Sequence, residues 1–173
     1  VTSSDFVPGQ LIVEHFSLSE YFTGSTVTMT WIVRTNGPFN LDGEQGDKFV
    51  LILPPGFEYS SRSEFTSDQP LLVNQRTGVA SSNCMNKTWI ACQTITIELP
   101  KGNGGEFPAW PSLTRVQMTF AGLLNTPLNS TAFMHISTQS AAGRVLDLNT
   151  DTLVRIYPRQ VTAVFTPSSA LAN

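Results

Sequence analysis

The sequence has few charged residues and no long apolar run. Its 173 residues include 10 Lys and Arg and 13 Asp and Glu, with a formal net charge of −3. Charged residues make up 13% of the chain, roughly half the share in an average soluble protein. Because Lys and Arg form no stripe or cluster, nucleic acid is excluded as a partner. No run reaches the ~20 apolar residues that cross a bilayer, so we expect no membrane insertion in this segment.

The length is enough for one domain with a sizeable core. Ser, Thr, Asn and Gln take the place of the missing charges, a composition common in exported β-proteins. The chain begins at Val1 without a signal-peptide pattern, and we expect it to be a processed or excised segment of a longer protein.

Both cysteines, Cys84 and Cys92, lie in one polar stretch, CMNKTWIAC. A zinc site needs about four ligands, and the two histidines, His15 and His135, are remote in sequence. In an oxidising compartment the two thiols predict a disulfide that closes a short hairpin and stabilises the fold by ~2–3 kcal/mol. In a reducing compartment they would be free thiols.

Two Asn-x-Ser/Thr triplets begin at Asn86 and Asn129, and both could carry glycans in a eukaryotic secretory pathway. The triplet at Asn86 falls between the cysteines, where an exposed hairpin would present it. Together with the disulfide, these sites predict an extracellular or cell-surface protein.

Apolar residues alternate with polar ones along most of the chain. The segment TVTMTWIV places Val27, Met29, Trp31 and Val33 on one face, the pattern of a half-buried strand. TITIEL (94–99) and RVQMTF (115–120) repeat it, whereas KFVLIL (48–53) is continuously apolar and suits a strand covered on both sides.

Further strands are expected in four segments: QLIVEHFSL (10–18), TAFMHIST (131–138), LVRIY (153–157) and QVTAVFT (160–166). The long connection 58–83 is expected to pair through PLLVNQ (70–75). No window has a capped 3.6-residue period, so we predict an all-β antiparallel sandwich of about seven to nine strands. Residues 1–160 form this module, and 161–173 are either its final strand or the start of a following repeat, because a strand and a Ser-rich turn occur near both ends of the chain.

The sequence also resembles a β-sandwich module repeated in large surface and secreted proteins of algae, oomycetes and bacteria. The resemblance covers most of the chain, from STVTMTWIV to VTAVFTPSS. The positions that carry it are Gly46, Asp47, Pro54, Pro55, Gly56, Phe57, Gly122, Asn125, Pro127 and Thr138.

GDKFVLILPPGF (46–57) is also similar to Ig-like modules of microbial cell-wall adhesins. The yeast agglutinin-like adhesins have more cysteines, so their peptide-binding residues are not carried over. Both likenesses imply an Ig-like sandwich that serves in adhesion or as a structural spacer.

Candidate catalytic and metal-binding residues are sparse. There is no G-x-S-x-G segment, and both histidines fall in predicted strands, so nucleophilic hydrolysis is not expected. The cluster Asp42, Glu44 and Asp47 could supply paired carboxylates, but LDGEQGD is better interpreted as a solvated turn. We expect no cofactor. The one alternative is calcium, because oxygen ligands alternate at Asp147, Asn149 and Asp151, although the glycine and distal Glu of an EF-hand loop are missing.

The sequence leaves two alternative roles open for the aromatic residues in the loops. Trp31 is predicted to lie in the core, whereas Trp89, Phe107 and Trp110 lie in expected loops. Loop aromatics either stack on sugar faces and partner pockets or close the open end of the sandwich.

The sequence thus predicts a non-enzymatic extracellular module, one unit of a larger surface or filamentous assembly. Its loops would contact neighbouring modules or partner proteins. The alternative is a carbohydrate-binding module that uses the loop aromatics.

Overall fold

The structure is a computed structural model that describes residues 7–40, 46–79, 92–102, 104–126 and 130–159. This part of the chain contains strands and no helix, so it holds no helix that could cross a membrane. The strands are β1 (Gly9–Gln10), β2 (Ile12–Leu18), β3 (Thr26–Arg34), β4 (Lys48–Leu53), β5 (Glu64–Ser67), β6 (Leu72–Val79), β7 (Cys92–Glu98), β8 (Arg115–Leu124), β9 (Ser130–Gln139) and β10 (Val145–Ile156).

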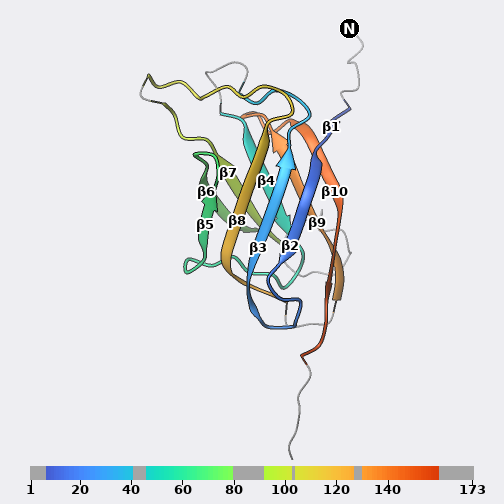
Figure 1. Cartoon of the computed structure of the whole chain (residues 1–173). Coiled ribbons are helices and arrows are strands. Elements are labelled where there is room, and N and C mark those ends of the chain that lie inside the picture. Colours follow the sequence, from blue (N-terminus) through green and yellow to red (C-terminus); the bar gives the residue numbers. More distant parts are fainter. Residues whose placement is uncertain (1–6, 41–45, 80–91, 103, 127–129, 160–173) are drawn as a thin grey trace, which may run out of the picture.

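The strands form two sheets that pack face to face (Figure 1). The six-stranded sheet has the order β1-β10-β9-β4-β7-β6, and the four-stranded sheet has the order β2-β3-β8-β5. Every pairing is antiparallel except β1 with β10, which is parallel.

Seven of these strands have the arrangement of an immunoglobulin constant domain. The order β2-β3-β8-β5 corresponds to A-B-E-D, and β10-β9-β4 corresponds to G-F-C. β6 and β7 lie between the D and E equivalents in sequence and extend the second sheet beyond β4, while β1 lies on the free edge of β10. The prediction of an all-β, Ig-like sandwich is confirmed. The ten described strands exceed the expected seven to nine because β1 and β5 are too short to show a pattern in the sequence.

The core lies between the sheets, as the alternation in the sequence predicts. Trp31 is fully buried and packs against Phe16, with ring centroids 4.6 Å apart. The other alternating residues of the predicted strands are also buried, and they include Val27, Met29, Val33, Ile95, Ile97, Leu99, Val116, Met118 and Phe120. In β4, Phe49, Leu51 and Leu53 face the core, and Val50 on the opposite face of the strand is also buried, with 7% of its surface exposed.

Two strands differ from the sequence prediction. The long connection after β4 forms β5, four residues that pair with β8. It also forms β6, a strand that was expected without a named partner and that pairs with β7. β10 begins at Val145, eight residues before the predicted strand at Leu153. Its first half, VLDLNTD, has no regular alternation because the register shifts between Asn149 and Thr152, at a β-bulge.

Candidate functional site

The chain enters the sandwich at the end where β1 meets the start of β10. We call this end, formed by residues 8–11, 35–40, 46–47, 107–110 and 147–148, the β1 end. Gly9 lies opposite Asp147 and Gln10 opposite Leu148 in the parallel pairing. The Leu11 amide then donates to the Leu148 carbonyl over 3.1 Å, after which the chain crosses to the other sheet as β2.

Asp147 is the buried polar centre of the β1 end. It is 3% exposed, and its Oδ2 accepts hydrogen bonds from the backbone amides of Asn36 at 3.0 Å and Gly37 at 3.2 Å. Its own amide donates to Thr138 Oγ1 at 3.0 Å. A buried carboxylate must be hydrogen-bonded to be tolerated, and here backbone N–H groups meet that need. Asp147 therefore ties the loop after β3 to β10.

Gly9 lets β1 lie against this centre. A Cβ atom at position 9 would overlap Asp147 Oδ1 and would lie 2.7 Å from Asn36 Nδ2. A side chain is therefore excluded by close packing and not by backbone conformation.

A reciprocal pair of side chain–backbone hydrogen bonds closes the loop between Asn40 and Asp47. The Asn40 amide donates to Asp47 Oδ2 at 2.6 Å, and the Asp47 amide donates to Asn40 Oδ1. Asn40 is buried with a φ of 56°, in the left-handed region that Asn tolerates better than most residues. Its Nδ2 also donates to the Pro108 carbonyl at 3.1 Å, which fixes the loop 100–112 to the same point. Asp47 thus acts as a structural acceptor.

Trp110 closes this end of the sandwich. It exchanges two backbone hydrogen bonds with Phe39, at 3.0 and 2.9 Å, and stacks on the Phe39 ring with centroids 5.2 Å apart. Phe39 in turn stacks on Phe49 in the core at 5.0 Å. Phe107 packs so closely to Gly46 that a Cβ there would lie 2.7 Å from its ring, and Lys101 Nζ lies 5.2 Å from the ring centroid. Of the two roles that the sequence left open for these loop aromatics, the geometry favours the cap.

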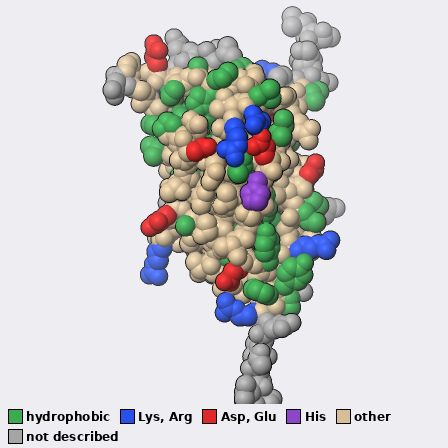
Figure 2. Space-filling view, in the orientation of Figure 1, with side chains coloured by type: hydrophobic (Ala, Val, Ile, Leu, Met, Phe, Trp, Pro, Cys, Tyr) green, Lys and Arg blue, Asp and Glu red, His purple; other side chains and the backbone are tan. Residues whose placement is uncertain are grey.

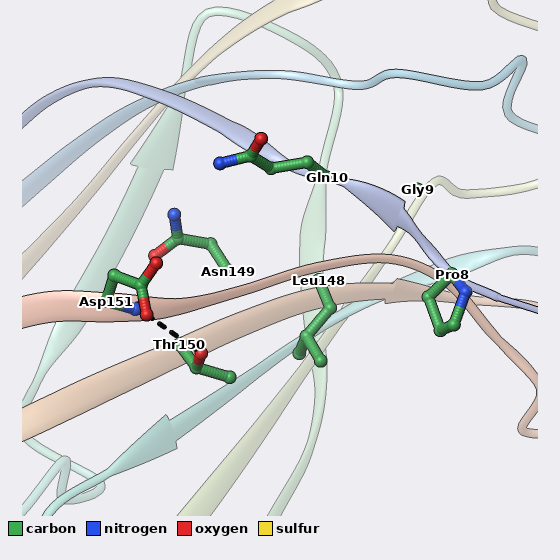
Figure 3. A pocket seen from close by; sticks show the side chains of 7 residues that line it. All are labelled: Pro8, Gly9, Gln10, Leu148, Asn149, Thr150 and Asp151. Atoms are coloured by element: carbon green, nitrogen blue, oxygen red, sulfur yellow. Dashed lines mark hydrogen bonds between the residues drawn. The ribbon is translucent and has the colours of Figure 1, made fainter.

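A groove of about 280 Å³ lies beside β1 and β10 (Figure 3). Its lining comprises Pro8, Gly9, Gln10, Leu148, Asn149, Thr150 and Asp151. Figure 3 shows the Gln10 and Asn149 amides directed toward the same space from the two strands, with Asp151 beside Asn149. Amides and one carboxylate could bind hydroxyl groups, but the groove is formed mainly by β1 leaving the edge of β10.

The candidate calcium ligands Asp147, Asn149 and Asp151 all accept hydrogen bonds from groups of the protein. The Asp147 carboxylate is buried against backbone amides, as described above. Asn149 Oδ1 accepts from the Asp151 amide at 3.3 Å and from Thr152 Oγ1 at 3.0 Å. Asp151 is exposed within the bulge, and its Oδ1 accepts from Thr150 Oγ1 at 3.1 Å. Among the described residues, no group of three or more His, Cys, Asp and Glu could hold a metal ion.

An ion cluster that the sequence did not reveal lies on the outer face of the four-stranded sheet. Glu14 from β2 contacts Arg34 from β3 and Arg115 from β8, the latter at 3.0 Å. The hydrogen bond from Arg34, aided by Arg115, lowers the pKa of Glu14 below the ordinary glutamate value, against the opposing effect of burial. Figure 2 shows charged side chains of both signs close together on this face. The three residues are far apart in sequence, so only the strand order brings them together.

The two histidines lie on the outer faces of opposite sheets. His15 Nε2 is 3.1 Å from Ser17 Oγ, but in the described part of the chain no carboxylate is hydrogen-bonded to this ring, as a catalytic triad requires. His135 lies on β9 opposite Ile52 of β4. Burial lowers the pKa of His135, and the nearby Asp151 carboxylate partly offsets this effect.

Several predicted site residues lie outside the described residues: Asp42, Glu44, Cys84, Asn86, Trp89 and Asn129. Cys92 is described; it begins β7 and is 3% exposed. The disulfide and both glycosylation sites therefore stay predictions.

No protein-family model matches the chain, and no curated protein sequence matches it. Among solved structures, the chain is similar to an uncharacterized protein from Nocardia farcinica whose crystal structure has an immunoglobulin-like fold. The two are 13% identical, with a TM-score of 0.39, and the match covers 85% of this chain and 97% of the other.

Gly9→Ala is expected to displace β1 from β10, because the added methyl group overlaps Asp147 and Asn36. The overlap should cost about 1–3 kcal/mol of unfolding free energy. Gly37→Ala is the matched control, since no atom lies within 4 Å of a Cβ there. Hydrogen exchange at the Leu11 amide should accelerate in Gly9→Ala alone. Equal protection in both variants would contradict the packing argument.

Trp110→Ala is expected to lower the unfolding free energy by about 2 kcal/mol, less than for a fully buried Trp because the ring is half-buried. Trp110→Phe keeps a ring for stacking on Phe39 and should lose much less. Urea unfolding measures both variants. A Trp110→Ala variant as stable as the parent would show that the cap does not support the fold.

Asp151→Asn is expected to lower the pKa of His135 further, because it removes the charge that opposes the effect of burial. Since folding depresses this pKa, the associated stability is present above the unfolded-state value of about 6.5. It is lost as the pH falls through the lower folded-state pKa. An NMR titration of the His135 ring measures the shift, with Asp68→Asn on the other sheet as control. An unchanged midpoint in Asp151→Asn would rule out the coupling.

Proposed function

We propose that the chain is a non-enzymatic extracellular module that acts in adhesion or as a structural spacer, one unit of a larger surface or filamentous assembly. The observation that carries the proposal is the path of the backbone. The described chain enters at the β1 end and leaves at the opposite end, and parallel pairing to β10 or its extension holds it at both places.

The opposite end is defined by Tyr157. There the Tyr157 amide donates to the Tyr21 carbonyl at 2.7 Å, and the Thr23 amide donates to the Tyr157 carbonyl at 2.9 Å, in a parallel bridge between Phe22 and Tyr157. From Asp147, opposite Gly9, to Tyr157 the chain runs ten residues of extended backbone, or about 33 Å. Figure 1 shows β1 and the end of β10 at opposite ends of the sandwich. Such a module transmits force along its long axis.

Tension along this axis loads the terminal pairings in shear. β1 and β10 run in the same direction, so pulling the two ends of the chain apart slides β1 along β10. The pairing of 21–23 with Tyr157 is also parallel and is loaded in the same way. In shear, the hydrogen bonds of a pairing must break together, whereas in a peeling geometry they break one at a time. The arrangement therefore favours resistance to extension, which is what a spacer or adhesive module requires.

The surface chemistry also supports this proposal. Figure 2 shows few charged side chains on the face in view, most of which is backbone and side chains that are neither charged nor hydrophobic. The resemblance to repeated surface modules implies the same class of function, and so do the predicted disulfide and glycosylation sites. Neighbouring modules or surface proteins are the expected partners.

The alternative is a carbohydrate-binding module, and one observation favours it. The groove beside β1 presents the Gln10 amide and the Asp151 carboxylate, groups that bind sugar hydroxyls. The loop aromatics proposed for this role give less support, since Trp110 stacks inside the cap and Trp89 lies outside the described residues. Glycan-array binding that is lost in Gln10→Ala would favour the alternative.

The spacer is tested by pulling single molecules of the chain from its two ends. Tyr157→Pro removes the amide that donates to Tyr21, and Tyr157→Ala keeps it; both remove a side chain that is 52% exposed. Losing one hydrogen bond of about 1 kcal/mol should raise the unfolding rate about fivefold. The unfolding force should thus be lower for Tyr157→Pro than for Tyr157→Ala, since the unfolding rate governs forced unfolding.

Two results would contradict the proposal. Equal unfolding forces for the two variants would show that the Tyr157 pairing carries no load. The second result would be unfolding of the parent chain at a force no higher than that of a module whose strands are peeled apart one hydrogen bond at a time. That result would contradict the mechanical role itself.

A further inference from the structure

The sequence that follows the last described strand resembles the sequence that begins the module. Residues 156–163 read IYPRQVTA, and residues 6–13 read FVPGQLIV. A shift of 150 residues superposes Pro8 on Pro158 and Gln10 on Gln160, with apolar residues matched at the first, second, sixth and eighth positions. In the structure, residues 8–13 are the ones that enter the sandwich through β1 and start β2. A shared pattern at a fixed period is the mark of a repeat.

The match continues if one residue is left out at the β2 bulge. The register of β2 against β3 shifts between Val13 and His15, so Glu14 is the extra residue of that strand. Without it, Phe16 falls on Phe165, Ser17 on Thr166 and Ser19 on Ser168. The structure thus accounts for the single gap in the comparison.

If residues 156–163 correspond to residues 6–13, they begin a second unit, and no linker separates it from the first. Tyr157 still pairs with residues 21–23 of the first unit, and Arg159 occupies the position of Gly9, the first residue of β1. Arg159 is itself held, because its amide donates to Thr23 Oγ1 at 3.4 Å and its guanidinium to Ser25 Oγ at 3.2 Å. The chain therefore passes from one set of fixed contacts to the start of the next unit within two residues, so the second unit would begin directly beside the first.

The Tyr157 end also carries exposed aromatic surface beside the point where the chain leaves. Tyr21, Phe22 and Tyr157 are 36%, 44% and 52% exposed, and we call these three residues the aromatic patch. Figure 2 shows hydrophobic side chains gathered at this end of the molecule. Buried Asn125 holds the patch in place by donating from Nδ2 to the carbonyls of Glu20 and Phe22, at 3.2 and 3.1 Å. Large exposed aromatic groups on a rigid frame are typical of contact surfaces.

We infer that the aromatic patch is a docking surface for the β1 end of a following module of the same kind, joined without a linker at Pro158. The continuity of the chain decides the occupant, because a unit that starts at Arg159 must lie directly against the patch. The inference rests on the proposed function and adds the partner, the junction and its stiffness.

One residue difference between the two segments decides which tandem protein tests the inference. Arg159 stands where Gly9 stands in this module, and no side chain fits at Gly9 beside Asp147. A tandem protein should therefore consist of residues 1–158 followed directly by residues 9–173, which keeps a Pro–Gly step at the junction. A spaced form carries about six Gly and Ser residues at the same point, enough to behave as a flexible linker.

The rotational correlation time from ¹⁵N relaxation reports whether the two units move as one body. We expect the joined form to tumble more than twofold more slowly than the single chain, and the spaced form to tumble nearly as fast as the single chain. Phe22→Ser in the joined form should restore independent tumbling. Leu72→Ser is the control, because Leu72 is 59% exposed on β6, at the edge of the six-stranded sheet far from β10.

Independent tumbling of the joined form would overturn the inference. A joined form that stays rigid with Phe22→Ser would overturn the role of the patch. The pulling experiment on the single chain separates this outcome from the proposed function, because it does not involve a second module. A stiff junction with weak single modules would reject the mechanical role, and strong modules with a loose junction would reject the docking surface.

Discussion

The burial of the Asp147 carboxylate determines how the loop after β3, the Trp110 cap and β1 are arranged at the β1 end. A carboxylate removed from water needs hydrogen-bond donors, and the backbone amides of Asn36 and Gly37 supply them. The loop after β3 is therefore held in one position, which places Phe39 under Trp110. A Cβ atom at Gly9 would overlap the same carboxylate, so a side chain at this position of β1 would have to displace Asp147. One charged side chain thus connects the cap, the loop and the terminal strand.

The residues that carry the resemblance to repeated surface modules have structural roles. Asp47 closes its loop with Asn40, and Asn125 holds the turn at residues 20–22. Gly56, with a φ of 86°, lies against Thr126, and Gly122, with a φ of 73°, lies in the β8 bulge. A pattern made of such residues identifies how a sandwich is closed at its ends. It does not identify a ligand, which is why the functional argument depends on the path of the chain.

The alternation of apolar residues was enough to predict the fold class and the core. Trp31 and its neighbours on β3 are buried as the pattern requires, because period-2 side chains must share a face. β5 was missed because EFTS is short and polar, and its existence depends on the free edge of β8. Asp147 was a candidate calcium ligand in the alternative interpretation, because an alternating oxygen pattern looks the same whether a metal or backbone amides satisfy it. The Glu14 ion cluster depends on strand order, which local patterns do not contain.

The sequence pattern of β10 says little about how the strand holds the two ends of the chain, because backbone groups make those contacts. β10 connects both terminal pairings through backbone hydrogen bonds, at Leu148 and then at Tyr157. The side chains of Leu148 and Tyr157 at these two pairings are exposed, whereas Asp147, Val154 and Ile156 are buried. Backbone groups are the same in every residue except proline, so pairings made by the backbone tolerate many sequences. What they cannot tolerate is a side chain at Gly9, or proline where an amide donates. For a module of this type, the positions to compare between relatives are therefore the few that protect the terminal backbone pairings, and not the apolar positions of the core.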